Sequence, residues 1–485
     1  MPLIWQSSAQ EKVFIDRDYR KKNTSIEEIE KGISAGNDIT ELNRFMFDPV
    51  TFALIEKTDN STVKYLLEKK GNEVDKLTHD GRTYIFWAAY RDNVELMEYL
   101  VNKGAKANIE DSHGYSVLNF AAVTGQTNPK LYDFLLQQGA DINATNHSGA
   151  NAILLVAPFA KDMAILDYFA NKGQDFKSTD DQGSGLFHYA SKGGKIALLK
   201  ALVKKGIPYK GVNQNGSNAM LMASQGTRGA QNGLETYTYL ESLGIAVNTI
   251  DENGRNPLHA IAARNQDPAI FSFFLKKGVD INKPDSDGVT PFMNAANRNS
   301  IAVLKFLLPY VIDINAKDKK GQSALAKAVG RNSVEAVSFL LNENADVNTL
   351  DARGNSLSYY LINNFDAKNP ERFESKLKAL KKAGLDVAKT QEAGNTLLHL
   401  AVKENDLALL KRLQEFDIDI NKKNDDGNTA LHLAAMISKD GSMLTYLIEQ
   451  GADKTVKTDF DESVYDLAIE NELLNKDSVA LELLK

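Results

Sequence analysis

The sequence predicts an all-α solenoid, in which each short helical repeat packs only on its neighbours. Two observations predict this fold class, and the composition is compatible with it. A turn motif of the type Asp/Asn-x-x-Gly recurs every 33 to 40 residues along most of the chain. Each interval contains a run of small residues and then a pair of large apolar residues. The composition, with 43% hydrophobic and 25% charged residues, is ordinary for a soluble folded protein.

The glycines of the turn motif set the period of the repeat. Asp or Asn bonds its own backbone there, and glycine tolerates the positive φ of a tight turn. A period near 33 residues with one turn and two helices is a known solenoid signature. The turn glycines are Gly81, Gly114, Gly149, Gly183, Gly216, Gly254, Gly288, Gly321, Gly354, Gly394 and Gly427.

Two helices are expected after each turn. Thr83, Thr290 and Thr429 stand two residues after their glycines, where a hydroxyl caps the first helix. Pro257 and Pro291 fit a first helical turn, which needs no N–H from that residue. Small residues in the first helix allow close stacking, and large pairs in the second helix supply the core, as in Ala121-Ala122, Ala295-Ala296, Leu135-Leu136 and Leu340-Leu341.

One complete repeat carries a family resemblance. Residues 251–262 read DENGRNPLHAIA, and residues 425–435 read DDGNTALHLAA. Both resemble the ankyrin opening D-x-x-G-x-T-P-L-H-x-A-A, and the resemblance extends over about residues 25–485. It implies helix-turn-helix units with hairpin fingers, in a bacterial-type array of about thirteen repeats. It also implies a protein partner held along the concave groove and the finger tips.

The terminal repeats are expected to differ, because their outer faces meet water. Asp461 stands where the last turn glycine is expected, and Asp48-Pro49 opens a degenerate first repeat. We predict an N-terminal tail at 1–24, a capping half-repeat at 25–45, the repeat array at 46–460 and a C-terminal capping repeat at 461–485.

Two long periods contain insertions at residues 226–233 and 363–373. Both lie between the two helices of a repeat, at the edge opposite the fingers. We expect tolerated surface loops outside the groove. A second contact edge is the alternative.

The first nine residues resemble the end of a secretory signal, because Leu3-Ile4-Trp5 precedes Ser7-Ser8-Ala9. The charged start and most of the apolar segment of such a signal are missing, so the resemblance could also be accidental. The absence of cysteine fits an oxidising compartment, although a cytosolic protein can also lack it. Together these features favour an extracytoplasmic location over a cytoplasmic one.

Composition and motifs argue against several function classes. The net charge of -7 disfavours nucleic acid as a partner, and no apolar run approaches the ~20 residues of a membrane span. We find no P-loop, no G-x-S-x-G and no H-E-x-x-H motif. We therefore expect a monomeric, non-enzymatic scaffold that needs no cofactor and no metal. The alternatives are a recruiting or protective accessory subunit of a separate enzyme and a purely structural spacer.

Four arginines occupy a predicted binding position, ten residues after a turn glycine: Arg91, Arg264, Arg298 and Arg331. The last three fall in consecutive repeats, so their guanidinium groups would form a row suited to an acidic partner. A structural alternative exists, because arginine at a helix C-terminus complements the helix dipole without any ligand.

Aromatic residues and histidines supply further candidates. Tyr90, Tyr115 and Phe159 occupy variable positions of neighbouring repeats and form a second candidate patch. His79, His113 and His147 lie at three successive finger tips, where we expect solvent-exposed contacts with a partner. By contrast, the family's histidine five residues after the glycine bonds the next repeat, and here this position holds His188, His259, His399 and His432. Trp87 is expected in the core.

Overall fold

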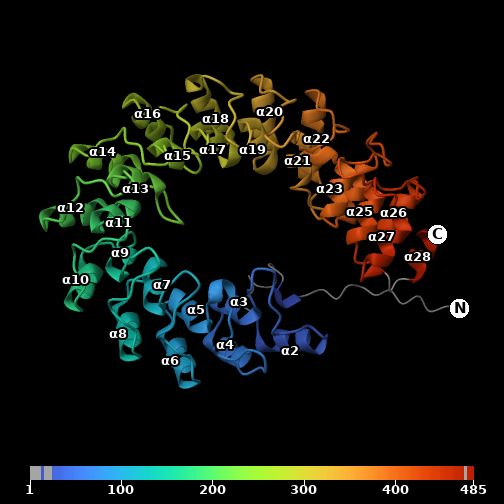
Figure 1. Ribbon diagram of the computed structural model, residues 1–485. Coiled ribbons are helices and arrows are strands. Elements are labelled where there is room, and N and C mark those ends of the chain that lie inside the picture. Colours follow the sequence, from blue (N-terminus) through green and yellow to red (C-terminus); the bar gives the residue numbers. More distant parts are fainter. Residues whose placement is uncertain (1–12, 16–23, 475–477, 485) are drawn as a thin grey trace. The chain divides into compact units, whose positions relative to one another are not determined.

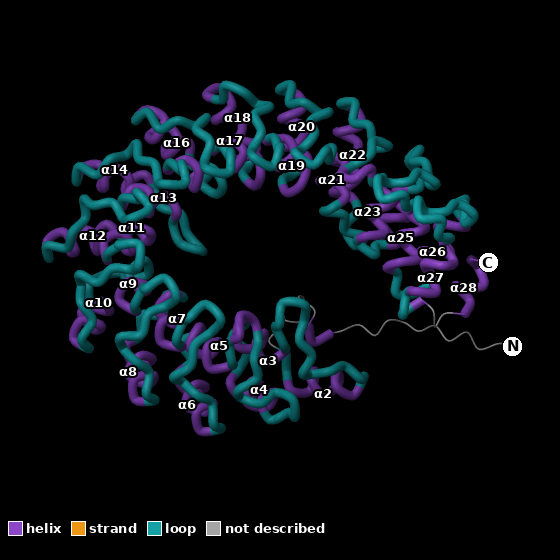
Figure 2. Tube along the Cα trace, in the orientation of Figure 1, coloured by secondary structure: helices purple, strands orange, loops and turns teal. Residues whose placement is uncertain are grey.

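The computed structural model describes residues 13–15, 24–474 and 478–484 (Figure 1). Figure 2 shows that the described chain consists of helices and loops. Extended pairing within it is limited to isolated bridges such as Glu110–Ser116 and Lys317–Ser323. The chain divides into two compact halves, residues 1–249 and 250–485. The prediction of an all-α repeat solenoid is confirmed, while the signal-like residues 1–9 lie outside the described part.

In the described part of the N-terminal half, a single helix, α2 (Ile26–Ser34), is followed by six helical pairs, one for each repeat. A short 3-10 turn, η1 (Val13–Ile15), precedes α2. The pairs are α3 (Pro49–Ile55) with α4 (Asn60–Leu67), α5 (Tyr84–Tyr90) with α6 (Val94–Asn102), α7 (Val117–Val123) with α8 (Pro129–Gln137), α9 (Ala152–Val156) with α10 (Ala164–Asn171), α11 (Leu186–Gly193) with α12 (Ile196–Lys204), and α13 (Ala219–Gln225) with α14 (Leu234–Ser242).

Seven further pairs are described in the C-terminal half, over residues 250–474 and 478–484. They are α15 (Pro257–Ile261) with α16 (Pro268–Lys276), α17 (Pro291–Arg298) with α18 (Ile301–Leu307), α19 (Ala324–Arg331) with α20 (Val334–Asn342), α21 (Leu357–Ile362) with α22 (Glu371–Lys382), α23 (Leu397–Lys403) with α24 (Leu407–Leu413), α25 (Ala430–Ile437) with α26 (Ser442–Glu449), and α27 (Val464–Glu470) with α28 (Ser478–Leu484).

Within each half, the first helices of successive repeats pack against one another, as α5 does on α7 and α17 on α19 (Figure 1). Their contact faces are built from small, fully buried residues such as Ala121 and Ala295. Small side chains let helix axes approach closely, so each repeat covers the core of the next. Among these described helices, none combines the length and apolar character needed to cross a lipid bilayer.

A hairpin turn, here called a finger, precedes the first helix of each repeat. In the finger of Gly114, the Asp111 N–H donates to the Tyr115 carbonyl, and the Gly114 N–H donates to the Asp111 carbonyl. Many neighbouring fingers are joined by one main-chain bond, from the second residue before one turn glycine to the residue before the previous glycine. The fingers around Met46 and Asp461 have no bond of this type to their described neighbours. Ser112 N–H donates in this way to Asp80 O at 2.9 Å, and Lys319 N–H donates to Asp287 O at 2.8 Å. We call this series the finger ladder.

The first and last fingers lack glycine at the turn. Met46, with φ 61°, and Asp461, with φ 66°, hold the left-handed conformation there. The first finger spans residues 43–47, because Asn43 N–H bonds Phe47 O and Met46 N–H bonds Asn43 O. It thus starts before residue 46, where the sequence placed the beginning of the array. Because Met46 stands where the turn motif has glycine, the motif did not reveal this finger in the sequence.

Two of the three predicted threonine caps are present. Thr290 and Thr429 accept the N–H groups of Met293 and His432, each at 3.3 Å. Thr83 stands at the N-cap position of α5, but its hydroxyl accepts no such bond and is buried without a partner. The prediction of a side-chain cap at Thr83 is wrong.

Candidate partner-binding site

Buried asparagines close the ends of the first helices in the C-terminal half. The Asn299 side-chain amide donates to Ala262 O at 2.8 Å and to Asn265 O at 2.7 Å. Asn332 repeats this contact one repeat later, on Ala296 O and Asn299 O. The last carbonyls of a helix have no partner within the helix. The next repeat therefore supplies the missing donors.

The arginine that precedes each asparagine points the other way, to solvent. Arg264, Arg298 and Arg331 are exposed. None of the three side chains has an ion-pair or hydrogen-bond partner within residues 250–474. Because α15, α17 and α19 pack in succession, the three side chains form a row with a spacing of about 8–10 Å. We call it the arginine row.

A fourth guanidinium extends the arginine row. Arg372, at the start of α22, donates from Nη2 to Arg331 O at 2.8 Å and to Asn332 O at 3.0 Å. Lys376, one turn later, donates to Val329 O at 2.7 Å. In this repeat, Arg372 and Lys376 replace the asparagine of the two preceding repeats. Sequence reasoning missed Arg372 because the insertion at 363–373 displaces it from the repeat position; the missing Arg-Asn pair after Gly354 was the available signal.

The insertion at 226–233 is anchored in a similar way. The Asn232 side chain donates to Ser191 O at 3.1 Å and to Ala223 O at 2.8 Å. Both insertions therefore end in residues that bond main-chain carbonyls near the ends of first helices. That their other residues form tolerated surface loops stays a prediction.

Other polar residues of the first helices are already paired. Lys327 contacts Asp318 at 2.6 Å, and the Tyr360 hydroxyl donates to Asp351 at 2.6 Å. In both pairs the donor lies six residues after the turn glycine and the carboxylate three residues before it. Asp267 is also engaged, because it accepts the Ala269 N–H at 2.9 Å. On α15, α17 and α19 and the residues directly after them, the described cationic side chains without an ion-pair or hydrogen-bond partner are Arg264, Arg298 and Arg331.

Arg91 has a different environment, in the N-terminal half. It is half-buried, and its guanidinium lies 4.7 Å from the centre of the Tyr90 ring. Its Nε is buried without a hydrogen-bond partner. Arg91 therefore forms no row with exposed neighbours.

The predicted aromatic patch is partly used by the fold. Tyr90, Tyr115 and Phe159 are half-buried. Tyr90 lies 6.3 Å from both Trp87 and Phe120, between ring centres, and Trp87 is buried as predicted. The Phe159 ring fits against Gly125, where a Cβ atom would come within 2.9 Å of it. Partner binding at this patch stays a prediction.

Two of the three finger-tip histidines, His79 and His113, contact the same carboxylate, that of Asp80. His79 and His113 each place Nε2 3.4 Å from Asp80 Oδ2. His79 Nδ1 also lies 2.9 Å from Phe45 O, and its ring stacks on Phe47. His147 is exposed and covers Gly114. Within the described residues, no group of three or more ligating side chains is arranged to hold a metal ion.

The remaining histidines connect repeats, as the sequence predicted. The His399 ring accepts the Thr396 N–H at Nδ1, 3.2 Å away, and donates from Nε2 to Asn428 O at 2.9 Å. His188, His259 and His432 make the equivalent contacts. Each ring must accept at one nitrogen and donate at the other, so it is neutral. Burial lowers the pKa of all four imidazoles.

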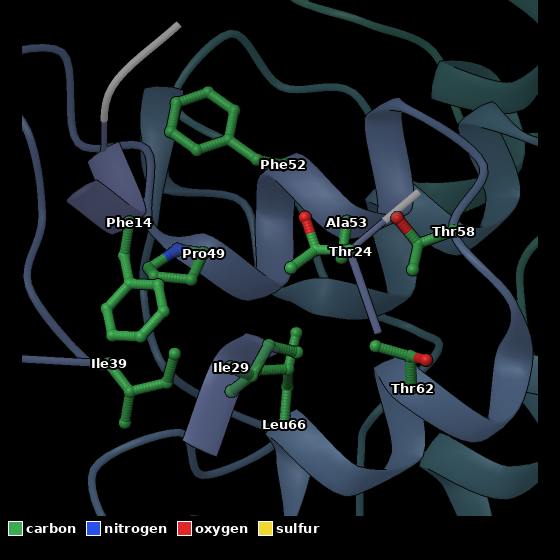
Figure 3. A pocket seen from close by; sticks show the side chains of 10 residues that line it. All are labelled: Phe14, Thr24, Ile29, Ile39, Pro49, Phe52, Ala53, Thr58, Thr62 and Leu66. Atoms are coloured by element: carbon green, nitrogen blue, oxygen red, sulfur yellow. The ribbon is translucent and has the colours of Figure 1, made fainter. Parts of the chain in front are cut away.

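An apolar pocket lies between α2, α3 and α4, and Figure 3 shows the side chains that line it. Its free space is about 30 Å³, which holds one water molecule. Phe14 is 3% exposed and packs over Gly32 of α2. The pocket therefore belongs to the packing of the N-terminal end and has no room for a ligand.

Family models for ankyrin repeats match most of this architecture. The model "Ankyrin repeats (3 copies)" matches residues 52–146, 227–318, 260–351 and 295–369, and "Ankyrin repeats (many copies)" matches residues 398–448. The chain is an ankyrin-repeat protein. Ankyrin repeats indicate a protein–protein interaction scaffold, and the ankyrin fold is generally non-catalytic.

Curated relatives share only part of their length with this ankyrin chain. Palmitoyltransferase AKR1 of Lachancea kluyveri is 25% identical over 168 residues, which cover 34% of this chain and 22% of that protein. E3 ubiquitin-protein ligase KEG of Arabidopsis thaliana is 31% identical over 106 residues, covering 22% of this chain and 6% of the ligase. The chain thus spans less than a quarter of either relative.

A solved ankyrin structure is also similar. The crystal structure of the human ASB11 ankyrin repeat domain has a TM-score of 0.39 and 21% identity. The match covers 48% of this chain and 98% of that domain.

Proposed function

We propose that the C-terminal half binds an extended, acidic segment of a partner protein along the arginine row. One observation carries the proposal: exposed arginines without partners end α17 and α19, and another lies three residues after the end of α15, while the adjacent asparagines are buried and hold the fold together. A guanidinium presents a planar fork of donors that matches a carboxylate.

The spacing of the row suggests the form of the partner. Neighbouring packed helices lie about 8–10 Å apart. A polyproline II segment rises about 3.1 Å per residue and has three residues per turn. Acidic residues at every third position would then project from one side at about 9 Å intervals. The proposed partner segment therefore carries Asp or Glu at positions i, i+3 and i+6.

The experiment compares two labelled peptides of equal composition by fluorescence anisotropy. One repeats Glu-Pro-Ala, and the other has its glutamates adjacent. We expect tighter binding of the first peptide, and weaker binding at higher salt. Replacing Arg264, Arg298 and Arg331 together by Gln should remove this binding. We expect each arginine to contribute about tenfold to the affinity, which corresponds to about 1.4 kcal/mol of binding free energy.

The matched control removes the same charge from second helices of the same half. Lys276, Lys305 and Lys378 are exposed on α16, α18 and α22, and the triple Gln variant at these sites should bind like the parent. Equal losses in both variants would show a non-specific charge effect. No binding to either peptide would contradict the acidic-segment proposal and favour a spacer role.

We also propose that the two predicted capping segments shield the apolar core at the two ends of the repeat array. Within the described residues no first helix precedes α2, and Phe14 from η1 covers its apolar side. At the other end, Asn471 donates to Ala435 O and Ser438 O, so the last repeat closes its neighbour as Asn332 does. The segments 25–45 and 461–485 would then limit exposure of the core.

A further inference from the structure

The loop after α18 takes an unusual path and exposes Ile312. This side chain is 87% exposed, the largest value among the described large apolar side chains. In the two flanking repeats, a residue in the left-handed conformation follows the second helix, Gly278 with φ 77° and Asn344 with φ 63°. Val311 holds this position after α18. Because a β-branched residue disfavours positive φ, Val311 keeps φ −87°, and the chain leaves α18 through a 3-10 turn, η3 (Leu308–Tyr310).

A shift of one residue in this loop accounts for the exposure. In the next repeat, the Asp346 N–H donates to the Asn315 side chain of the preceding repeat at 2.8 Å. The equivalent bond after α18 comes from the Ile312 N–H, which donates to the Asn282 side chain at 2.9 Å. Ile312 stands one position earlier in its repeat than Asp346, so it takes the exposed place of an aspartate. Its sequence equivalent Ala345 is buried, with 6% exposed.

Ile312 belongs to a small apolar surface, here called the apolar patch, made of Pro309, Tyr310 and Ile312. Tyr310 is 49% exposed, and Pro309 is exposed beside it. Asn282 holds the patch in place, because its side chain also donates to the Tyr310 carbonyl at 3.0 Å. The Tyr310 ring lies 6.2 Å from the Phe306 ring of α18. No described part of the chain covers these side chains, and ordered apolar surfaces of this kind commonly anchor interfaces.

Opposite charges flank the apolar patch. Helices α16, α18 and α20 pack in succession, so the end of α18 lies between the ends of the other two (Figure 1). Lys276 ends α16, and Glu343 follows α20 as its C-cap residue; both are exposed. Neither side chain has an ion-pair partner within the described residues of this half. The patch therefore has a positive flank and a negative flank, each about one helix spacing, 8–10 Å, away.

We propose that a second copy of this chain docks on the apolar patch in a two-fold symmetric contact. In such a contact each surface meets its own copy. When the two rows of helix ends run antiparallel, Lys276 of one copy faces Glu343 of the other in both directions, on either side of the paired apolar patches. The contact closes at a dimer, and its small area implies weak association that depends on concentration. This inference departs from the monomer expected from the sequence and does not depend on the arginine row, which lies on the first helices.

The first test is sedimentation velocity on the full chain at roughly 10 to 500 µM, where weak contacts become visible. The parent should shift from monomer to dimer with concentration and form nothing larger. Ile312→Asp, which gives the loop the residue type of Asp346, should weaken dimerisation at least about tenfold. The matched control is Val212→Asp in the N-terminal half, where another apolar side chain is 62% exposed. It should dimerise like the parent, and circular dichroism should match for all variants.

Exchange of the flanking charges tests the two-fold arrangement. Lys276→Glu and Glu343→Lys should each weaken dimerisation, because like charges then meet at both flanks. Their equimolar mixture should form a mixed dimer, since opposite charges face each other again. A parent that stays monomeric throughout would overturn the proposal, as would Ile312→Asp that dimerises like the parent or a mixture that associates no better than either variant alone. A monomeric parent that cosediments with phosphatidylserine vesicles would overturn it in favour of a lipid surface.

Discussion

The side-chain amide of Asn332 donates a 2.9 Å hydrogen bond to the main-chain oxygen of Asn299, the residue that holds the same position one repeat earlier. Asn299 in turn donates to the main-chain oxygen of Asn265. Each asparagine is buried. The helix ends of three repeats are therefore linked by side-chain amides, beside the exposed arginines of the proposed binding site.

Asn332→Ala should destabilise the C-terminal half. The change removes three hydrogen bonds: it leaves the carbonyls of Ala296 and Asn299 without these donors and the Ser333 N–H without its acceptor, at a cost of about 1–3 kcal/mol. Urea unfolding followed by circular dichroism measures it. Arg331→Ala is the neighbouring control and should cost less than about 1 kcal/mol, the helix-dipole contribution of an exposed charge. Equal losses would mean that the arginine is structural.

Stability should fall as the pH drops below about 6.5, the ordinary pKa of histidine. Burial lowers the pKa of His188, His259, His399 and His432 in the folded state. Below that pH the unfolded chain binds protons that the folded chain excludes, so acid favours unfolding. The melting temperature at pH 7.5 and 5.5 measures the effect. His259→Ala with His399→Ala should lower stability at pH 7.5 and reduce the pH dependence; an unchanged pH dependence would contradict this role.

Lys376→Met should abolish the part of the rise in folding stability with pH that Lys376 causes in mildly alkaline solution. Burial, with a smaller effect of Arg372, lowers the Lys376 pKa to about 8. The unfolded value is about 10.4. Between these values only the unfolded chain keeps the proton, so this residue makes the parent more stable as the pH rises. The difference in unfolding free energy between parent and variant should therefore change between pH 7.5 and 9.5. A constant difference would show that Lys376 is not buried in this way.

Arg82→Met should destabilise the N-terminal half by about 3–5 kcal/mol, because it leaves the buried Asp111 carboxylate without its ion-pair partner. Arg82 contacts Asp111 through Nε at 2.8 Å and Nη2 at 2.7 Å. Its guanidinium also lies 4.3 Å from the centre of the Phe120 ring. Adding Asp111→Asn should recover part of the loss in urea unfolding. A double variant as unstable as Arg82→Met would indicate that the lost ring packing dominates.

Local chemistry made the fold predictable. The turn glycines, Pro257 at the start of α15 and the interface histidine His259 follow from rules that hold within one repeat, and the structure confirms them. Met46 and Thr83 show the limit of such rules. Methionine adopts the left-handed turn conformation at the first finger, and a threonine at the right position makes no cap.

The candidate site was less predictable, because it depends on contacts between repeats. Arg372 reaches Arg331 across 41 positions of sequence, and the insertion shifts it out of register. The half-burial of Tyr90 and Phe159 results from rings and glycines in adjacent repeats. Sequence periodicity gives the position of a residue in its own repeat, whereas exposure depends on the neighbouring repeat.

The finger ladder separates what the fold conserves from what natural selection can vary. Each rung consists of a main-chain N–H and a main-chain carbonyl, as between Ser112 and Asp80, so no particular side chain is needed at the tip. Substitutions there can accumulate by neutral drift while the register of the array persists. A lineage of such proteins could therefore acquire new partners through changes at the tips, without prior compensating mutations in the core.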